Sequence, residues 1–147
     1  MFNTDHDFRA YVDAERAEHL RAVFIVEDAM PYAYTIGNAI HGGPELLLIG
    51  SADAGVRDLL HHVSRMLPRD PRSGYTFKPQ AKAPTRLKVV DANVGRASEV
   101  LHTLRIAEYH LATPFRLMQV LLPDPKGFYP GDPGCAEPYS RVPVIGG

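Results

Sequence analysis

The sequence predicts an α+β fold: a single domain with one mixed, mostly antiparallel sheet, about three helices and a Pro/Gly-rich C-terminal segment. Two short β-branched and aromatic runs follow each other closely near the N-terminus, and later apolar runs alternate with stretches of helical periodicity. No internal repeat or linker divides the chain. A length of 147 residues is that of one ordinary domain, and we expect its core over about residues 5–133 and a tail over 134–147.

The chain is expected to begin with a helix and a β-hairpin. A partial apolar stripe among charged residues predicts a peripheral helix from about Asp7 to Arg21. The runs Ala22–Val26 and Tyr32–Ile36 predict two adjacent strands, because the dipeptide Met30-Pro31 between them favours a turn.

A buried strand and a strongly periodic helix are expected next. Glu45–Gly50 contains an apolar run without alternation, which is typical of a central strand covered on both faces. Between Asp53 and Met66, apolar residues recur at intervals of three and four, and Ser51 or Asp53 can serve as the N-cap.

The remaining elements lie between proline-rich loops. Prolines interrupt residues 68–84, so we expect a long loop there with a short extended piece at Tyr75–Lys78. A strand at Leu87–Ala92, a helix at Ser98–Leu111 and a final strand at Phe115–Leu122 follow. We expect the helices to pack mostly on one face of the sheet.

Composition and charge argue against several classes of protein. The net charge of -1 lacks the positive field that nucleic-acid binding needs, and no apolar run is long enough to span a bilayer. We therefore expect a cytoplasmic protein that binds neither nucleic acid nor membrane, with a homo-oligomer left open. The single cysteine, Cys135, excludes an intramolecular disulfide. Because the chain has no P-loop, dinucleotide-binding loop or paired metal-ligand spacing, we expect no cofactor and no metal.

Three short segments carry a family resemblance. They are Tyr32-Ala33-Tyr34-Thr35-Ile36-Gly37, then Gly43-Pro44-Glu45-Leu46, and then Leu121-Leu122-Pro123-Asp124 with Gly127-Phe128-Tyr129-Pro130. In this order they resemble the bacterial and phage proteins of the domain of unknown function 4262 family, over about residues 22–133. The chain departs from that pattern at Asn38, where the family has an apolar residue, and at Gly131, where it has a tryptophan. The family carries no established activity, so the resemblance implies fold boundaries and a site but no reaction.

The first group of candidate site residues lies where one expected strand ends and the next begins. Tyr34, Thr35 and Gly37 end a strand, and His41 and Glu45 follow within a few residues. If the two strands are neighbours, these side chains gather at one end of the sheet, where strands hold the backbone and loops shape a cleft. The alternative is structural: Gly37 supplies a turn and Tyr34 fills the core.

The second group follows the last expected strand. Asp124 comes directly after an apolar strand, as Glu45 comes directly before one, but parallel and antiparallel pairing both place the two acids apart. Asp124 most simply holds a turn through its side chain. We expect the segment 123–130, with Phe128 or Tyr129 buried, to lie against the Tyr34–Gly37 strand and to form one wall of the cleft.

Two functions remain open. The first is a binding or regulatory module that presents the cleft to a small molecule, peptide or protein. The second is a small cofactor-independent enzyme, a hydrolase or isomerase, with His41 or Glu45 as general base and Tyr34 as a donor. A composite metal site of His41, Glu45 and His61 or His62 is a weaker alternative. The basic stretch from residue 65 to 88 suits an anionic ligand or partner, but a solvated flexible loop is favoured because the net charge of the chain is compensated elsewhere.

Overall fold

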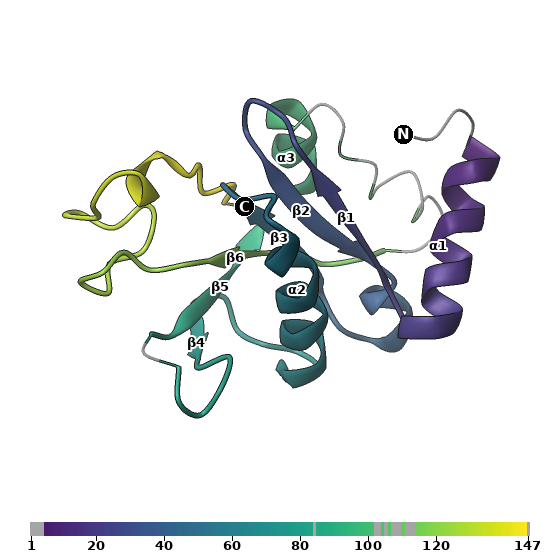
Figure 1. The fold of residues 1–147 in the computed structure, drawn as a ribbon, viewed down its shortest axis with the longest axis horizontal. Coiled ribbons are helices and arrows are strands. Elements are labelled where there is room, and N and C mark those ends of the chain that lie inside the picture. Colours follow the sequence, from purple (N-terminus) through teal and green to yellow (C-terminus); the bar gives the residue numbers. More distant parts are fainter. Residues whose placement is uncertain are drawn as a thin grey trace.

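The structure of the chain is a computed structural model that describes residues 5–83, 85–101, 104, 106, 110 and 114–146. Its elements, in chain order, are α1 (Asp5–His19), β1 (Ala22–Val26), β2 (Tyr32–Ile36), the 3₁₀ helix η1 (Asn38–His41), β3 (Glu45–Ile49), α2 (Ala54–Met66), β4 (Tyr75–Phe77), β5 (Leu87–Ala92), α3 (Val94–Val100), β6 (Leu117–Leu121) and the 3₁₀ helix η2 (Tyr139–Arg141). Figure 1 shows these elements around one twisted sheet.

The sheet has six strands in the order β1-β2-β3-β6-β5-β4. Only the central pair, β3 and β6, is parallel among the described strands, and Glu45 there pairs with Leu117. Every other described pair is antiparallel. The prediction of a mixed, mostly antiparallel sheet is therefore confirmed, and the apolar run that begins at Glu45 is a central strand.

Helices cover both faces of the sheet (Figure 1). Alternate strand residues face opposite sides, so Phe24 packs in one core cluster and its neighbour Val23 in the other. The first cluster joins the sheet to α1 and α3, through Phe8 of α1 and Ala97 of α3 among others. The second joins it to α2. Two helices thus share one face and α2 takes the other, which explains why β3 is apolar on both sides.

Most strand bounds follow the sequence patterns, but the helix expected at Ser98–Leu111 is corrected. In the structure α3 begins earlier, at Val94, because the Asn93 side chain accepts a hydrogen bond from the amide of Arg96 and caps the helix. This helix ends at Val100, whereas Ile106, a described residue later in the expected range, is again helical. Positions 102–103, 105, 107–109 and 111, which the same prediction covers, lie outside the described residues.

The C-terminal stretch packs back onto the sheet. Gln119 of β6 is fully buried and uses both ends of its amide: it donates to the carbonyl of Pro143 at 2.7 Å and accepts from the amide of Ile145 at 2.9 Å. Ile145 is itself buried in the core cluster that α1 and α3 cover. Within the described part of the chain, no helix has the length and apolar character to cross a membrane.

Candidate functional site

Glu45 is the centre of a buried polar network at one end of the sheet. Its side chain is fully buried, although it is acidic and belongs to the first residue of a central strand. One oxygen, Oε1, accepts from the Thr35 hydroxyl at 2.8 Å and from the Asn38 amide at 3.1 Å. The other, Oε2, accepts from the amides of Gly37 at 2.8 Å and Ala39 at 3.3 Å. The loop between β2 and β3 therefore wraps around the carboxylate, which satisfies donors that burial would otherwise leave unpaired.

His110 completes this network from a distant part of the chain. Its Nε2 lies 2.7 Å from Oε2 of Glu45, and both side chains are almost completely buried. The His110 ring also contacts Phe115, with ring centroids 4.8 Å apart. Glu45 thus joins β2, β3, η1 and the segment before β6. Sequence reasoning missed His110, because an isolated histidine far from Glu45 in the chain carries no local signal.

Gly37 is required by the backbone at the start of this loop. It has a φ of +130°, and a Cβ at this position would lie 2.8 Å from the carbonyl oxygen of Leu20 and 2.9 Å from Cα of Arg21. Neither backbone atom can move freely, so only glycine fits. The structural interpretation of Gly37 as a turn residue is confirmed, and its amide additionally binds Glu45.

Asn38 connects Glu45 to a buried cation. Its backbone amide donates to Glu45, while its side-chain Oδ1 accepts from Nε of Arg21 at 2.7 Å. Its side-chain nitrogen donates to the hydroxyls of Ser64 at 2.9 Å and Thr35 at 3.3 Å. Asn38 therefore bridges a buried anion, through its backbone amide, and a buried cation, through its side chain, without direct contact between the two charges.

Arg21 is the most unusual residue of this end of the sheet. It is only 6% exposed, yet its hydrogen-bond partners are neutral: besides Asn38, Nη1 donates to the carbonyl of His19 at 3.1 Å and lies 3.5 Å from Nδ1 of His61. Among the described residues, none accepts a hydrogen bond from its Nη2. Burial lowers the pKa of Arg21, and Arg65 lowers it further, whereas Glu45 raises it. Arg21 is therefore a buried cation with no carboxylate hydrogen-bonded to it in the described chain.

His61 remains neutral at physiological pH. Burial, followed by the charges of Arg21 and Arg57, lowers its pKa from 6.5 to about 4. A neutral ring can accept a hydrogen bond from Arg21 at Nδ1 while Nε2 carries the proton. This Nε2 is buried and has no hydrogen-bond partner in the described chain.

A small cavity of about 120 Å³ opens beside Arg21. Polar and charged side chains from η1, from α2 and from the loops before β1 and after α2 line it, together with Gly43, Pro44, Leu67 and Pro68; these residues are Arg21, Asn38, His41, Ser64 and Arg69. Glu45 is not among them. The structure thus places the exposed His41 in the cavity lining and Glu45 outside it. The two candidate general bases therefore do not face the same cavity.

Tyr34 does not contribute to this cavity, contrary to expectation. It is 1% exposed and stacks on Phe24, with ring centroids 5.1 Å apart, and on Tyr32 at 6.0 Å. These rings belong to the core cluster covered by α1 and α3. Because Tyr34 and Thr35 are successive residues of one strand, their side chains point to opposite faces. The alternative in which Tyr34 fills the core is confirmed.

Asp124 lies at the other end of the sheet. It follows the end of β6, whereas Glu45 begins β3, and the parallel pairing of these strands separates the two acids. Asp124 is 1% exposed and accepts from the amides of Lys126 at 2.9 Å, Phe128 at 2.8 Å and Ala136 at 2.8 Å. Burial alone would raise the pKa of Asp124, but these backbone hydrogen bonds together lower it. The prediction that Asp124 holds a turn is confirmed.

The segment 123–130 does not form a wall beside the Tyr34–Gly37 strand, and this prediction is wrong. The strand β2 runs antiparallel to β3, so its last residues lie next to Glu45 and away from Asp124. The segment instead contacts β5 and the loop before it: the Tyr129 hydroxyl donates to the carbonyl of Arg86 at 2.8 Å, and Lys88 Nζ lies 5.2 Å from the Tyr129 ring centre. Tyr129 is half-buried and Phe128 is 41% exposed, so neither ring is fully buried.

Comparison with known proteins identifies the family. The family model described as Domain of unknown function (DUF4262) matches residues 14–136. The chain belongs to the DUF4262 family. No curated protein and no solved structure matches it. The DUF4262 match covers both buried acids and extends into α1, beyond the limits of about 22 and 133 that the sequence motifs indicated.

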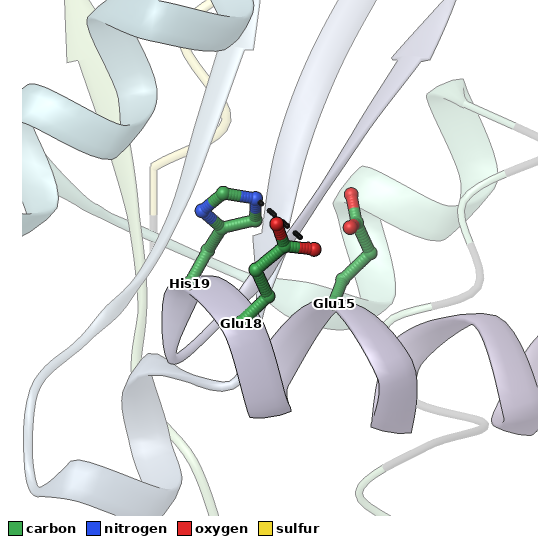
Figure 2. A group of neighbouring side chains, drawn as sticks. All are labelled: Glu15, Glu18 and His19. Carbon is green, nitrogen blue, oxygen red and sulfur yellow. Dashed lines mark ion pairs between the residues drawn. The ribbon is translucent and has the colours of Figure 1, made fainter.

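Elsewhere in this DUF4262 chain, Glu15, Glu18 and His19 lie close together on α1 (Figure 2). Their potential ligand atoms are within 4.8 Å of one another. Glu15, however, already forms an ion pair with Arg57 and accepts from the Tyr11 hydroxyl at 3.2 Å. Within the described residues, His41, Glu45 and His61 or His62 are not brought into such a group. Neither set therefore forms a prepared metal centre.

Proposed function

We propose that this DUF4262 chain is a ligand-binding module whose ligand carries a compact anionic group, such as a phosphate or a carboxylate, bound in the cavity beside Arg21. The buried guanidinium of Arg21 carries this proposal. It lines the cavity, its hydrogen-bond partners in the described chain are neutral, and its Nη2 has no acceptor there. Buried charges in proteins are normally paired, so an anion from outside would supply the missing partner.

The surroundings of the cavity favour the same charge. Arg69 and His41 line it with Arg21, and its described lining includes no acidic residue. Arg65, on the last turn of α2, adds a further positive charge close enough to lower the pKa of Arg21. A volume of about 120 Å³ suits a single anionic group better than a whole nucleotide, so the rest of the ligand would extend into solvent.

Glu45 supports this proposal as a positioning residue. It fixes the β2–β3 loop and holds Asn38, which in turn fixes Arg21. Use of Glu45 or His41 as a general base in a hydrolase or isomerase is less favoured. Each oxygen of Glu45 already accepts at least two hydrogen bonds, and the acid is outside the cavity lining. The cytoplasmic location expected from the sequence stays a prediction, and a homo-oligomer stays open.

The proposal is tested by titrating the protein with inorganic phosphate at constant ionic strength. A bound anion stabilises the folded state by mass action, so phosphate should raise the melting temperature in proportion to the logarithm of its concentration once that concentration exceeds Kd. We expect Arg21→Met to abolish this rise and Arg69→Met to weaken it, because Arg69 lies at the exposed side of the cavity.

Arg72→Met is the matched control, since Arg72 is an exposed arginine of the same basic stretch outside the cavity lining. It should keep the wild-type response. An equal response of the Arg21→Met and Arg72→Met variants, or no response of the wild type beyond that to chloride, would contradict the proposal.

A further inference from the structure

A second and larger cavity lies at the end of the sheet opposite Arg21. It has a volume of about 500 Å³ and is lined by three separate parts of the chain. These are the β1–β2 turn at Ala29–Pro31, the ends of β3 and β6 with the residues that follow them, and the C-terminal segment at 138–142 with Pro130. In Figure 1 the C-terminal segment, in yellow, lies beyond this end of the sheet. The cavity therefore sits at the carboxyl ends of the parallel strand pair, a common position for ligands in sheets with parallel strands.

The walls of this cavity are apolar. Leucine, isoleucine, valine, proline and methionine side chains make up most of the lining, and Met30 is unbranched and adaptable. Of the described lining residues, only Ser51, Tyr139 and Arg141 carry polar side chains. Arg141 is 71% exposed and is paired with Glu137 in solvent. The lining thus offers a large apolar contact surface and a few polar groups.

Gly50 connects two walls of the cavity to the end of β3. Its amide donates to the carbonyl of Pro31 at 2.8 Å, which ties the β1–β2 turn to the end of β3. It has a φ of +107°, and a Cβ there would lie 2.9 Å from Cγ2 of Val142. The absence of a side chain at Gly50 therefore lets the C-terminal segment approach the strand end.

The C-terminal segment, which forms the third wall, is held by a buried residue of β6. The buried Gln119 binds the backbone on either side of Val144, through Pro143 and Ile145. The carbonyl of Ile145 also accepts from the amide of Asn93 at 2.9 Å. These contacts anchor the segment that follows the cavity wall, so ligand binding would require little further ordering of the chain.

We propose that this cavity binds an uncharged, predominantly apolar small molecule with one or two polar groups. The volume is within the range typical of small-molecule sites, and an apolar lining with few polar groups is their usual composition. The strands at the cavity, β3 and β6, are central, so they offer no free edge to a peptide strand. This inference does not depend on the anion site, because the two cavities share no lining residue.

The test uses N-phenyl-1-naphthylamine, a neutral apolar probe whose fluorescence rises in an apolar site. We expect saturable binding of one probe per folded chain. Ala29→Trp places a large ring at the exposed turn that lines the cavity and should weaken binding by about tenfold or more. Ser51→Trp, on another wall of the same cavity, should have the same effect.

Ala81→Trp is the matched control, because Ala81 is equally exposed but lies in the loop before β5, outside the lining. The natural chain has no tryptophan, so each variant carries one and the optical background is the same. The proposal is overturned if the wild type shows no saturable binding. It is also overturned if Ala29→Trp and Ser51→Trp bind the probe as tightly as Ala81→Trp, with all three variants folded by near-ultraviolet circular dichroism.

Discussion

Glu45 and Asp124 are two buried acids at opposite ends of neighbouring parallel strands, and they differ in where their partners come from. Both accept hydrogen bonds from backbone amides. The partners of Asp124 all lie within the loop that follows β6, at residues 126–136. Those of Glu45 include a side chain of β2, the start of η1 and His110, which is 65 residues away in the sequence.

This difference separates a local role from a long-range one. An acid that binds only its own loop shapes a turn, and removing it affects that turn. An acid that binds several elements fixes their relative positions, and here it also holds Asn38 against the buried Arg21. The same residue chemistry therefore produces a turn at one end of the sheet and a charged cavity at the other.

The largest effect is expected from neutralising Glu45. In Glu45→Gln, the NH₂ of the new side-chain amide would replace one carboxylate oxygen. It would then face the amide or hydroxyl donors that this oxygen accepts from in the wild type. Breaking a buried charged network of this kind costs about 3 kcal/mol of unfolding free energy. Urea unfolding at pH 7 measures the loss.

Asp124→Asn is the matched variant and should cost less, because its donors belong to a single loop whose residues 125–128 are exposed. Equal losses in the two variants would break the distinction between a long-range and a local acid. A larger loss for Asp124→Asn would reverse it.

A smaller effect is expected from Asn38→Leu, which places an apolar side chain where the family pattern has one. Arg21 would lose its Nε acceptor and Ser64 would lose a donor, while the backbone amide at position 38 could still bind Glu45. Leaving a buried cation short of one acceptor should lower the unfolding free energy by about 2 kcal/mol.

Ser64→Ala provides the graded control, since it removes only the neutral hydrogen bond to Asn38 and should cost about 1 kcal/mol. Urea unfolding of both variants, read with the phosphate titration, shows whether Asn38 acts through Arg21. If Asn38→Leu loses no more stability than Ser64→Ala, the connection that Asn38 makes between Glu45 and Arg21 does not contribute to the unfolding free energy.

The last effects appear only as the pH is lowered, in the pH dependence of stability, where the two ends of the sheet act in different ranges. The folded-state pKa of His61 is about 4, below its ordinary value of 6.5, so the unfolded chain binds more protons between these values. Stability should fall as the pH is lowered from 6.5 to 4, and His61→Gln should flatten that part of the curve. His62→Gln, at the next position of α2, is the control and should leave this slope in place.

Asp124 contributes in a more acidic range. Its folded-state pKa is below 3.8, so its stabilising contribution is complete above that value and is lost as the pH falls through the lowered pKa. Asp124→Asn should therefore lower the stability at neutral pH and flatten the curve at its acidic end. Both effects are read from urea midpoints measured at closely spaced pH values, and a His61→Gln curve that keeps the wild-type slope would contradict the first.

Much of the fold could be predicted because strand signals are local. The bounds of β1, β2 and β5 are those of the apolar and β-branched runs of the sequence. Glu45 could also be singled out, because an acid directly before a fully apolar strand needs a buried partner. The start of α3 differs from the apolar periodicity because it is set by the Asn93 cap, which lies before the periodic residues.

The site was predicted less completely, because its polar residues acquire their roles only through the tertiary fold. Arg21 follows a helix and His110 is an isolated histidine, so neither carries a motif. Asn38 had a detectable signal: it replaces the apolar residue of the family pattern, and it proves to be the bridge to Arg21. The strand pattern itself excludes Tyr34 from the site, since Tyr34 and Thr35 are successive residues of one strand and cannot both face one cleft.

The parallel pairing of β3 with β6 has a consequence for any attempt to divide the molecule. These strands are adjacent at the centre of the sheet, but α2, β4, β5 and α3 all lie between them in the chain. The amide of Glu45 donates to the carbonyl of Arg116 immediately before β6, and its carboxylate meets His110. A fragment that ends before β6 would keep the N-terminal meander of β1, β2 and β3 but would expose the inner edge of β3 as an unpaired, apolar strand. Truncation before the segment that leads into β6 would therefore remove the support of Glu45 and create an aggregation-prone edge in the same step.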